Sequence, residues 1–229
     1  MTQARQQTLH LLIKDFQNTS VQKDDCLRAL AATDWDKLKA KEILNGMHDW
    51  RVRYCPEQVT AEDCPNTLAM KAFIPGGFSR NGFPLLECWL SRWTPSSYDF
   101  EEHHRFIAFI FGRSLRRGIA SDRFALIFDM SGWNPLRHTT PHAIRITISV
   151  VRLIHVEFCE RLGIILCVNT PIAFQVVWRI IEPLMEPRIR ERIHLLGRNW
   201  RSVVAEHVDE DNLPQQLGGK SPERSWEQY

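Results

Sequence analysis

The stretch Gly163–Leu196, GIILCVNTPIAFQVVWRIIEPLMEPRIRERIHLL, changes from strand-like to helix-like patterning and back. Residues 163–168 are apolar and rich in β-branched side chains, and a turn-forming Asn-Thr-Pro closes them, which is typical of a buried strand. From Ala173 to Leu184 the apolar residues recur at the spacing of one helix face. Two prolines then end or kink the helix, and a second strand follows. The stretch therefore predicts an amphipathic helix between two strands, with one side of the helix against apolar neighbours.

The remaining patterns add further strands and helices around this stretch. Apolar runs bounded by turn residues predict two more strands. Capping residues and helical periodicity predict the helices. The expected elements are three helices within residues 4–54, strands at residues 85–89 and 124–130, and helices at about residues 99–117, 140–162 and 199–207. Together they predict an α/β domain with a mixed sheet and flanking helices, preceded by a small helical bundle.

The chain divides into three segments on these patterns. Residues 1–58 form the N-terminal helical bundle, and residues 59–220 form the α/β domain. Three short helices bury little apolar surface alone, so we expect the bundle to pack against the domain. Residues 221–229 are polar and are expected to be a flexible tail.

Three motifs in this order resemble the CRAL-TRIO lipid-binding family. They are Asn169-x-Pro171-x-x-Phe174, Pro183-Leu184-Met185-Glu186-Pro187, and Leu213-Pro214 followed by Gly218-Gly219. The N-terminal helices also resemble the small bundle that precedes this domain in the family. The resemblance implies a CRAL-TRIO-like mixed sheet with a gated hydrophobic pocket, in which the amphipathic helix is a movable gate over one lipid. Periodicity alone favours the alternative, an ordinary core helix.

The resemblance also implies which side chains surround the lipid. The pocket wall would come from alternating residues of the second and third strands, and the gate from the helix. Alternation leaves open which face of each strand turns to the lipid, because both faces are apolar. The expected pocket and gate residues are Phe128, Met130, Leu166, Val168, Phe174, Val177, Trp178, Ile181 and Leu184.

A lipid head-group site is implied at Glu160, Arg161 and Arg192. The first two residues precede the glycine of the central strand, and Arg192 follows the proline corner. A guanidinium can donate two hydrogen bonds to a phosphate, and a carboxylate can accept hydrogen bonds from sugar-like hydroxyls. The alternative is a group of surface ion pairs at the ends of a helix and a strand.

The predicted function is a cytosolic lipid-binding and transfer protein that holds one phospholipid, phosphatidylinositol or phosphatidylcholine, and exchanges it at membranes. Leu30, Ala31 and Ile189 stand where phosphatidylinositol-binding members carry polar or basic residues. These departures favour an alternative, a carrier of a sterol, a tocopherol or a retinoid. A second alternative is a protein-interaction module of the same fold without a transport role.

Composition and spacing argue against other classes. The net charge of +2 is too small to indicate nucleic-acid binding. The six cysteines contain no CxxC pair, which indicates a reducing compartment and no metal site. Residues 101–104, EEHH, lack the His-Glu-x-x-His spacing, and we interpret them as a solvated helix face. Asp129 and Ser131 belong to no nucleophile elbow, so we expect no catalytic residue and no enzyme activity.

The expected location is the cytoplasm, with peripheral membrane association. The N-terminus lacks a signal-peptide pattern, and no run of about 18 apolar residues could span a membrane. The expected partners are a phospholipid or another hydrophobic small molecule and, transiently, a membrane surface. We expect a monomer that binds no nucleic acid and needs no cofactor besides the bound lipid.

Overall fold

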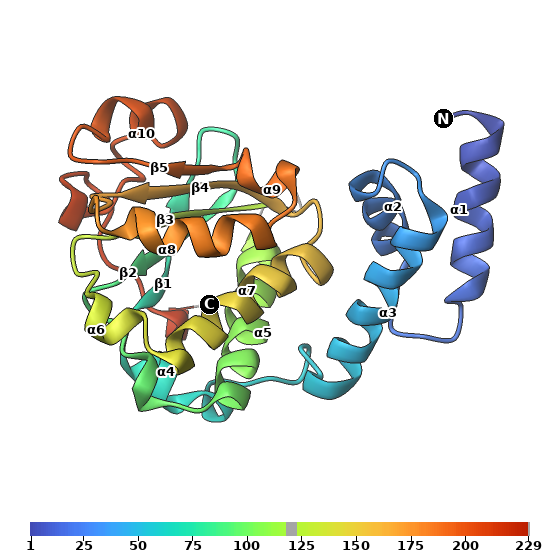
Figure 1. Cartoon of the computed structure of the whole chain (residues 1–229), viewed down its shortest axis with the longest axis horizontal. Coiled ribbons are helices and arrows are strands. Elements are labelled where there is room, and N and C mark those ends of the chain that lie inside the picture. Colours follow the sequence, from blue (N-terminus) through green and yellow to red (C-terminus); the bar gives the residue numbers. More distant parts are fainter. Residues whose placement is uncertain (118–122, 229) are drawn as a thin grey trace.

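Five strands form one mixed sheet in the computed structural model, which describes residues 1–117 and 123–228. They are β1 (Phe73–Phe78), β2 (Pro84–Trp89), β3 (Phe124–Asp129), β4 (Leu162–Val168) and β5 (Ile193–Leu195). The strands lie side by side in that order, with β1 antiparallel to β2 and the other neighbours parallel (Figure 1). The predicted α/β fold is confirmed. The sequence does not predict β1, because Pro75, Gly76 and Gly77 are poor strand formers that an edge strand tolerates.

Helices cover both faces of this sheet. Helices α5, α7 and α8 pack on one face, and α10 packs on the other (Figure 1). The predicted helices are therefore present on both sides, each with its apolar stripe against the strands. The described residues form α1 (Gln3–Asp15), α2 (Lys23–Ala32), α3 (Lys37–Tyr54), α4 (Pro65–Ala69), α5 (Phe100–Arg117), α6 (Pro135–His138), α7 (Pro141–Val156), α8 (Phe174–Ile181), α9 (Pro187–Arg190) and α10 (Arg201–His207).

An irregularity at Gly163 sets which side chains of β4 face α5 and α7. Phe124 of β3 lies opposite Leu162, and the next residue, Ala125, lies opposite Ile164. Gly163 is skipped in the pairing, so the in-and-out alternation of β4 is inverted beyond it. This inversion decides which β4 residues reach the cavity described below.

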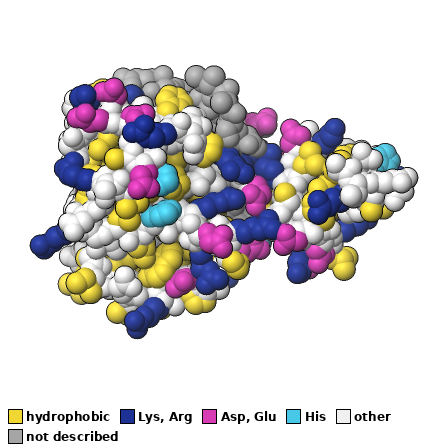
Figure 2. Space-filling view, turned by 90° about the horizontal axis from the view of Figure 1, so that it is seen from above, with side chains coloured by type: hydrophobic (Ala, Val, Ile, Leu, Met, Phe, Trp, Pro, Cys, Tyr) yellow, Lys and Arg dark blue, Asp and Glu magenta, His cyan; other side chains and the backbone are white. Residues whose placement is uncertain are grey.

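The three N-terminal helices share a core with the end of α7. Their buried apolar side chains pack around Cys159, and Trp50 near the end of α3 belongs to the main core of the sheet domain. Basic and acidic side chains are intermingled where these helices join the larger part of the molecule (Figure 2). The expected helices are present and pack on the domain, and the boundary at residue 58 stays a prediction.

One buried ion cluster crosses this junction. The Arg51 guanidinium of α3 donates to Asp25 at 2.7 Å and to Glu157, just after α7, at 2.9 Å. It also donates to the carbonyl of Ser20 at 2.9 Å. Burial opposes the charge of Asp25, but the hydrogen bonds and charge of Arg51 hold the pKa of Asp25 below its ordinary value. Burial raises the pKa of Glu157 in spite of the same guanidinium. The cluster therefore ties three segments together through desolvated charges.

The C-terminal segment is packed, which corrects the expectation of a flexible tail at residues 221–229. Ser221 and Trp226 are buried, and the Trp226 indole donates to the carbonyl of Phe73 at 2.8 Å. The Trp226 ring also meets Phe109 of α5 edge to face. The prediction failed because it rested on the polar composition of the segment, whereas Trp226 anchors it by packing. Residue 229 lies outside the described residues.

Glu87 of β2 gives a testable pH dependence. It is fully buried on the sheet face covered by α10, and burial raises its pKa to about 8. The unfolded chain releases this proton near pH 4.5, whereas the folded chain retains it, so stability falls as pH rises through this window. From about pH 5 to about pH 6.5 this group should lower the free energy of unfolding by about 2 kcal/mol. In urea unfolding, the free energy of unfolding of Glu87→Gln should fall by about 2 kcal/mol less than that of the wild type over this pH range. Parallel pH curves for the two proteins would contradict the assignment.

Candidate functional site

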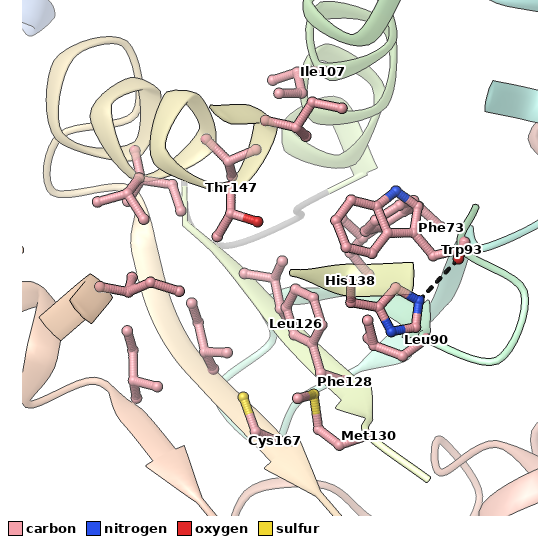
Figure 3. Close-up of a pocket in the computed structure, with 18 of the residues that line it drawn as sticks. Phe73, Leu90, Trp93, Ile107, Leu126, Phe128, Met130, His138, Thr147 and Cys167 are labelled. Carbon is pink, nitrogen blue, oxygen red and sulfur yellow. Dashed lines mark hydrogen bonds between the residues drawn. The ribbon is translucent and has the colours of Figure 1, made fainter. Parts of the chain in front are cut away.

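An apolar cavity of about 210 Å³ lies between the sheet and helices α5, α7 and α8. Its floor is formed by side chains of β3 and β4, and α8 forms the cover. Figure 3 shows Leu126, Phe128 and Cys167 on the strands, with Ile107 and Thr147 on the helices around the same space. Among the described residues, the lining contains no Lys, Arg, Asp or Glu side chain. The cavity therefore suits a hydrophobic molecule.

Six of the nine expected pocket and gate residues line this cavity. They are Phe128, Met130, Phe174, Val177, Trp178 and Ile181. The placement of Leu166 and Val168 is corrected, because both lie on the opposite face and pack in the core under α10. The Gly163 irregularity explains this, since it turns Ile165 and Cys167 to the cavity instead. Leu184 is also corrected: it is 50% exposed, in the turn after α8.

Helix α8 covers the cavity with its inner side and exposes apolar residues, beside Gln175 and Arg179, on its outer side. Its inner residues cover the cavity, and Phe174 meets Trp133 edge to face. On the outer side, Val176 is 67% exposed and Ile180 is 56% exposed. Val176 and Ile180 therefore give the outer side of this helix an apolar surface that the described part of the chain leaves uncovered.

Glu160 and Arg192 meet in a small recess beside the cavity. The Arg192 guanidinium donates to Glu160 at 2.8 Å and to the carbonyl of Leu162 at 2.7 Å. Arg188 and Arg123 place nitrogens 3.8 and 3.9 Å from the same carboxylate. The recess and the cavity share the lining residues Ile154 and Ile189. The end of the cavity therefore adjoins an ionic recess, which Glu160, Glu186, Arg188 and Arg192 line.

Arg161 is not part of this recess. The preceding residue, Glu160, has a left-handed backbone conformation with φ 57°. This turn of the backbone directs the Glu160 side chain into the recess and leaves Arg161 outside it. The charge of Arg161 acts on Glu157, near the N-terminal helices. The structure therefore brings together two of the three expected head-group residues.

The corner after α8 also touches the N-terminal helices. Arg188 of α9 donates to the carbonyl of Ala31 at 2.5 Å and to the carboxylate of Asp34. Leu30 is fully buried in the core of the N-terminal helices and reaches neither the recess nor the cavity. Of the two residues that depart from the phosphatidylinositol-binding pattern here, Ala31 therefore contacts the corner through its backbone carbonyl, and Leu30 lies in the core of the N-terminal helices.

Three cavity-lining polar residues were not expected from the sequence: His103, His138 and Thr147. His138 contacts the carbonyl of Trp93 at 3.0 Å through Nε2, as Figure 3 shows. Its Nδ1 accepts from the backbone N–H of Asn134 at 2.9 Å. The signal for His103 was its place in the apolar stripe of α5, three and four residues before Phe106 and Ile107.

The interpretation of residues 101–104 as a solvated face is wrong for three of the four. Glu102, His103 and His104 are buried. Glu102 accepts from the Thr67 backbone at 2.9 Å and so caps α4, while His104 stacks on Tyr54 with ring centroids 4.9 Å apart. The polar groups of Glu102 and His104 are therefore hydrogen-bonded inside the fold, which a count of polar residues does not reveal.

Asp129 has a structural role at the end of β3. Its carboxylate accepts from the Ser131 hydroxyl at 2.7 Å and from the Asn169 amide at 2.8 Å. Within residues 1–117 and 123–228, no group of three or more His, Cys, Asp or Glu side chains could hold a metal ion. In the same ranges, no helix combines the length and apolar character needed to cross a membrane.

Comparisons with known proteins agree with this architecture. A family model for the CRAL/TRIO domain matches residues 68–219. A CRAL-TRIO domain-containing protein of Caenorhabditis elegans is 22% identical over 211 residues, which cover 84% of this chain and 29% of that protein. The Sec14 cytosolic factor of Schizosaccharomyces pombe is 35% identical over 60 residues, covering 26% of this chain and 21% of that protein.

A solved structure shows the same fold. The crystal structure of Sfh5 matches with a TM-score of 0.61 at 15% sequence identity, covering 75% of this chain and 62% of that one. The matched regions span less than a third of the length of the curated relatives, including the SEC14 cytosolic factor of Candida glabrata, where they span 20%.

Proposed function

The chain belongs to the CRAL/TRIO domain family, and from that premise we propose that it binds one lipid in the cavity beneath α8 and exchanges it at membrane surfaces. The observation that carries the proposal is the cavity itself, whose lining has no charged side chain among the described residues. Burying each methylene of an acyl chain there contributes about 0.8 kcal/mol. Binding and release need no covalent chemistry, so the proposed activity is not enzymatic.

The outer surface of α8 supports exchange at a membrane. A helix that covers an apolar cavity and also exposes Val176 and Ile180 can face acyl chains on both sides when it opens. The relatives named cytosolic factors fit a protein that visits membranes from the cytosol. We therefore propose a cytoplasmic protein with transient, peripheral membrane association.

The first ligand that we propose is a phospholipid, phosphatidylinositol or phosphatidylcholine. Its phosphate would lie at the recess of Glu160 and Arg192, where Arg188 and Arg123 add further guanidinium groups. The acyl chains would pass Ile154, which lines both the recess and the cavity. The close pair at 2.8 Å would have to open partly to admit the phosphate.

A second ligand class is a neutral lipid such as a sterol, a tocopherol or a retinoid. The observation that favours it is the ion pairing of the recess, since Arg192 is already bound to Glu160 and to a carbonyl. Such a lipid would lie within the uncharged cavity, and its binding would leave the ion pair of the recess intact.

Native mass spectrometry of the protein purified from a eukaryotic host, followed by lipid extraction, tests the proposal. We expect a phospholipid adduct whose occupancy falls about tenfold in the double variant Glu160→Ala with Arg192→Ala, because charge-assisted hydrogen bonds to phosphate are lost. The control is the double variant Glu182→Ala with Arg190→Ala. It removes an ion pair in the same corner, with nitrogen and oxygen 3.7 Å apart, whose residues line neither the cavity nor the recess.

The other outcomes separate the alternatives. A neutral lipid whose occupancy is the same in both double variants would replace the phospholipid by the second class. Protein without any adduct, which also takes up no lipid from phosphatidylcholine or phosphatidylinositol vesicles, would contradict lipid binding and leave a protein-interaction module.

A further inference from the structure

His103 interrupts the apolar face that α5 turns to the cavity. The residues that share this face, Phe106, Ile107 and Ile110, follow at the spacing of one helix stripe and also line the cavity. His103 is only 3% exposed. A histidine at such a position removes two polar nitrogens from water, and this has a cost unless they find partners.

Within the described part of the chain, neither ring nitrogen of His103 has a hydrogen-bond partner. It is the single cavity-lining residue, among those described, that buries nitrogen or oxygen atoms in this state. The other two newly found polar residues are engaged, since His138 uses both nitrogens and the Thr147 hydroxyl donates to the carbonyl of Ala143 at 3.0 Å. The unmet hydrogen bonds at the cavity wall are those of His103.

The imidazole is also uncharged. Burial, with smaller contributions from the charges of His104 and His142, lowers the pKa of His103 to about 3. The neutral ring offers one N–H donor and one nitrogen acceptor. Those two functions match a hydroxyl group, which can donate and accept, or a carbonyl, which accepts. A carboxylate or phosphate would meet no cation there, and its desolvation would be uncompensated.

His103 lies far from the recess of Glu160 along the cavity. The ring of Tyr98 stacks on His103 with centroids 5.7 Å apart, and the Tyr98 carbonyl is 3.2 Å from Nε2 of His142, in the first turn of α7. Ile154, which lines both spaces, is near the other end of α7. Twelve residues of helix separate His142 from Ile154, or about 18 Å. The cavity thus has a neutral polar end at His103, and its other end adjoins the ionic recess.

We infer that His103 is a specificity-determining residue, which binds the uncharged hydroxyl or carbonyl oxygen of an otherwise apolar lipid. The inference rests on the proposed lipid binding and favours the second of the two proposed ligand classes: neutral lipids with a single such oxygen, held with that oxygen at the His103 end. A hydrocarbon ligand without the oxygen leaves the imidazole unsatisfied and binds more weakly.

Three probes of equal chain length test this directly: hexadecanol, hexadecane and hexadecanoate, offered to delipidated full-length protein and measured by native mass spectrometry and competition. We expect the wild type to bind hexadecanol about tenfold more tightly than either of the others. In His103→Leu the preference for the alcohol over the hydrocarbon should disappear. The control His104→Leu removes the adjacent buried histidine, which does not line the cavity, and should keep the preference.

The comparison of alcohol with hydrocarbon in the wild type needs no variant, so it holds even if His103→Leu folds poorly. The ¹⁵N shifts of the His103 ring should also change on loading with hexadecanol and not with hexadecane. Equal binding of the two probes, or a preference that survives in His103→Leu, would overturn the inference and leave the lipid carrier intact. Failure to bind any probe or to take up lipid from phosphatidylcholine vesicles would overturn both.

Discussion

Replacing Arg51 with alanine is expected to lower the free energy of unfolding by about 3–5 kcal/mol. The guanidinium is the shared partner of Asp25 and Glu157, whose side chains are 2% and 8% exposed. Removing it leaves two carboxylates buried close together without their cation, although Arg28 still contacts Asp25. Urea unfolding followed by circular dichroism near neutral pH measures the loss.

A matched control lies two residues further along α3. Arg53 pairs with Glu101 at 2.6 Å, but these side chains are 64% and 41% exposed. Arg53→Ala should therefore change the free energy of unfolding by no more than about 0.5 kcal/mol. Equal losses for the two variants would show that the buried cluster contributes no more to stability than an exposed ion pair. Asp25→Asn with Glu157→Gln should recover part of the stability of Arg51→Ala, because the uncompensated charges are removed.

Local patterns predict most elements of this fold, because they depend on neighbours a few residues apart. The helix stripes of α5 and α8 and the apolar runs of β2, β3 and β4 follow from spacing, and α7 follows from its length and its threonine-proline cap. β1 was beyond this reasoning, since its Pro75, Gly76 and Gly77 are acceptable only because the strand lies at the sheet edge. Trp226 was missed for a similar reason: one aromatic residue anchors a segment whose composition is polar.

The cavity was harder to predict than the elements around it. Both faces of β4 are apolar, and the face that reaches the cavity depends on its register with β3, which skips Gly163. Leu166 and Val168 were therefore assigned to the wrong side. The amphipathic period of α8 placed Val177 and Ile181 on the cavity side, but it put Val176 and Ile180 on the same face, and these are exposed. His103 was visible in the sequence only as a polar residue in an apolar stripe.

The outer side of α8 gives the largest expected effect on membrane binding. Replacing Val176 and Ile180 with glutamate should weaken association with vesicles of phosphatidylcholine and phosphatidylserine on the order of a hundredfold. Each exposed side chain would lose about 1 kcal/mol of burial in the membrane, and the added charges would cost about 1 kcal/mol beside anionic lipid. A total of about 3 kcal/mol corresponds to that ratio. Sedimentation with vesicles measures the change.

The position of these residues makes the experiment specific to α8. Both are exposed and neither lines the cavity, so folding stability and the lipid already bound should be unchanged. Leu38 and Val52 on α3 are 76% and 62% exposed and provide the matched control as Leu38→Glu with Val52→Glu. If that control weakens vesicle binding as much, general charge is responsible. If neither pair has an effect, α8 does not meet the membrane. Loss confined to the α8 pair would make the helix both the cover of the cavity and the surface through which its lipid leaves.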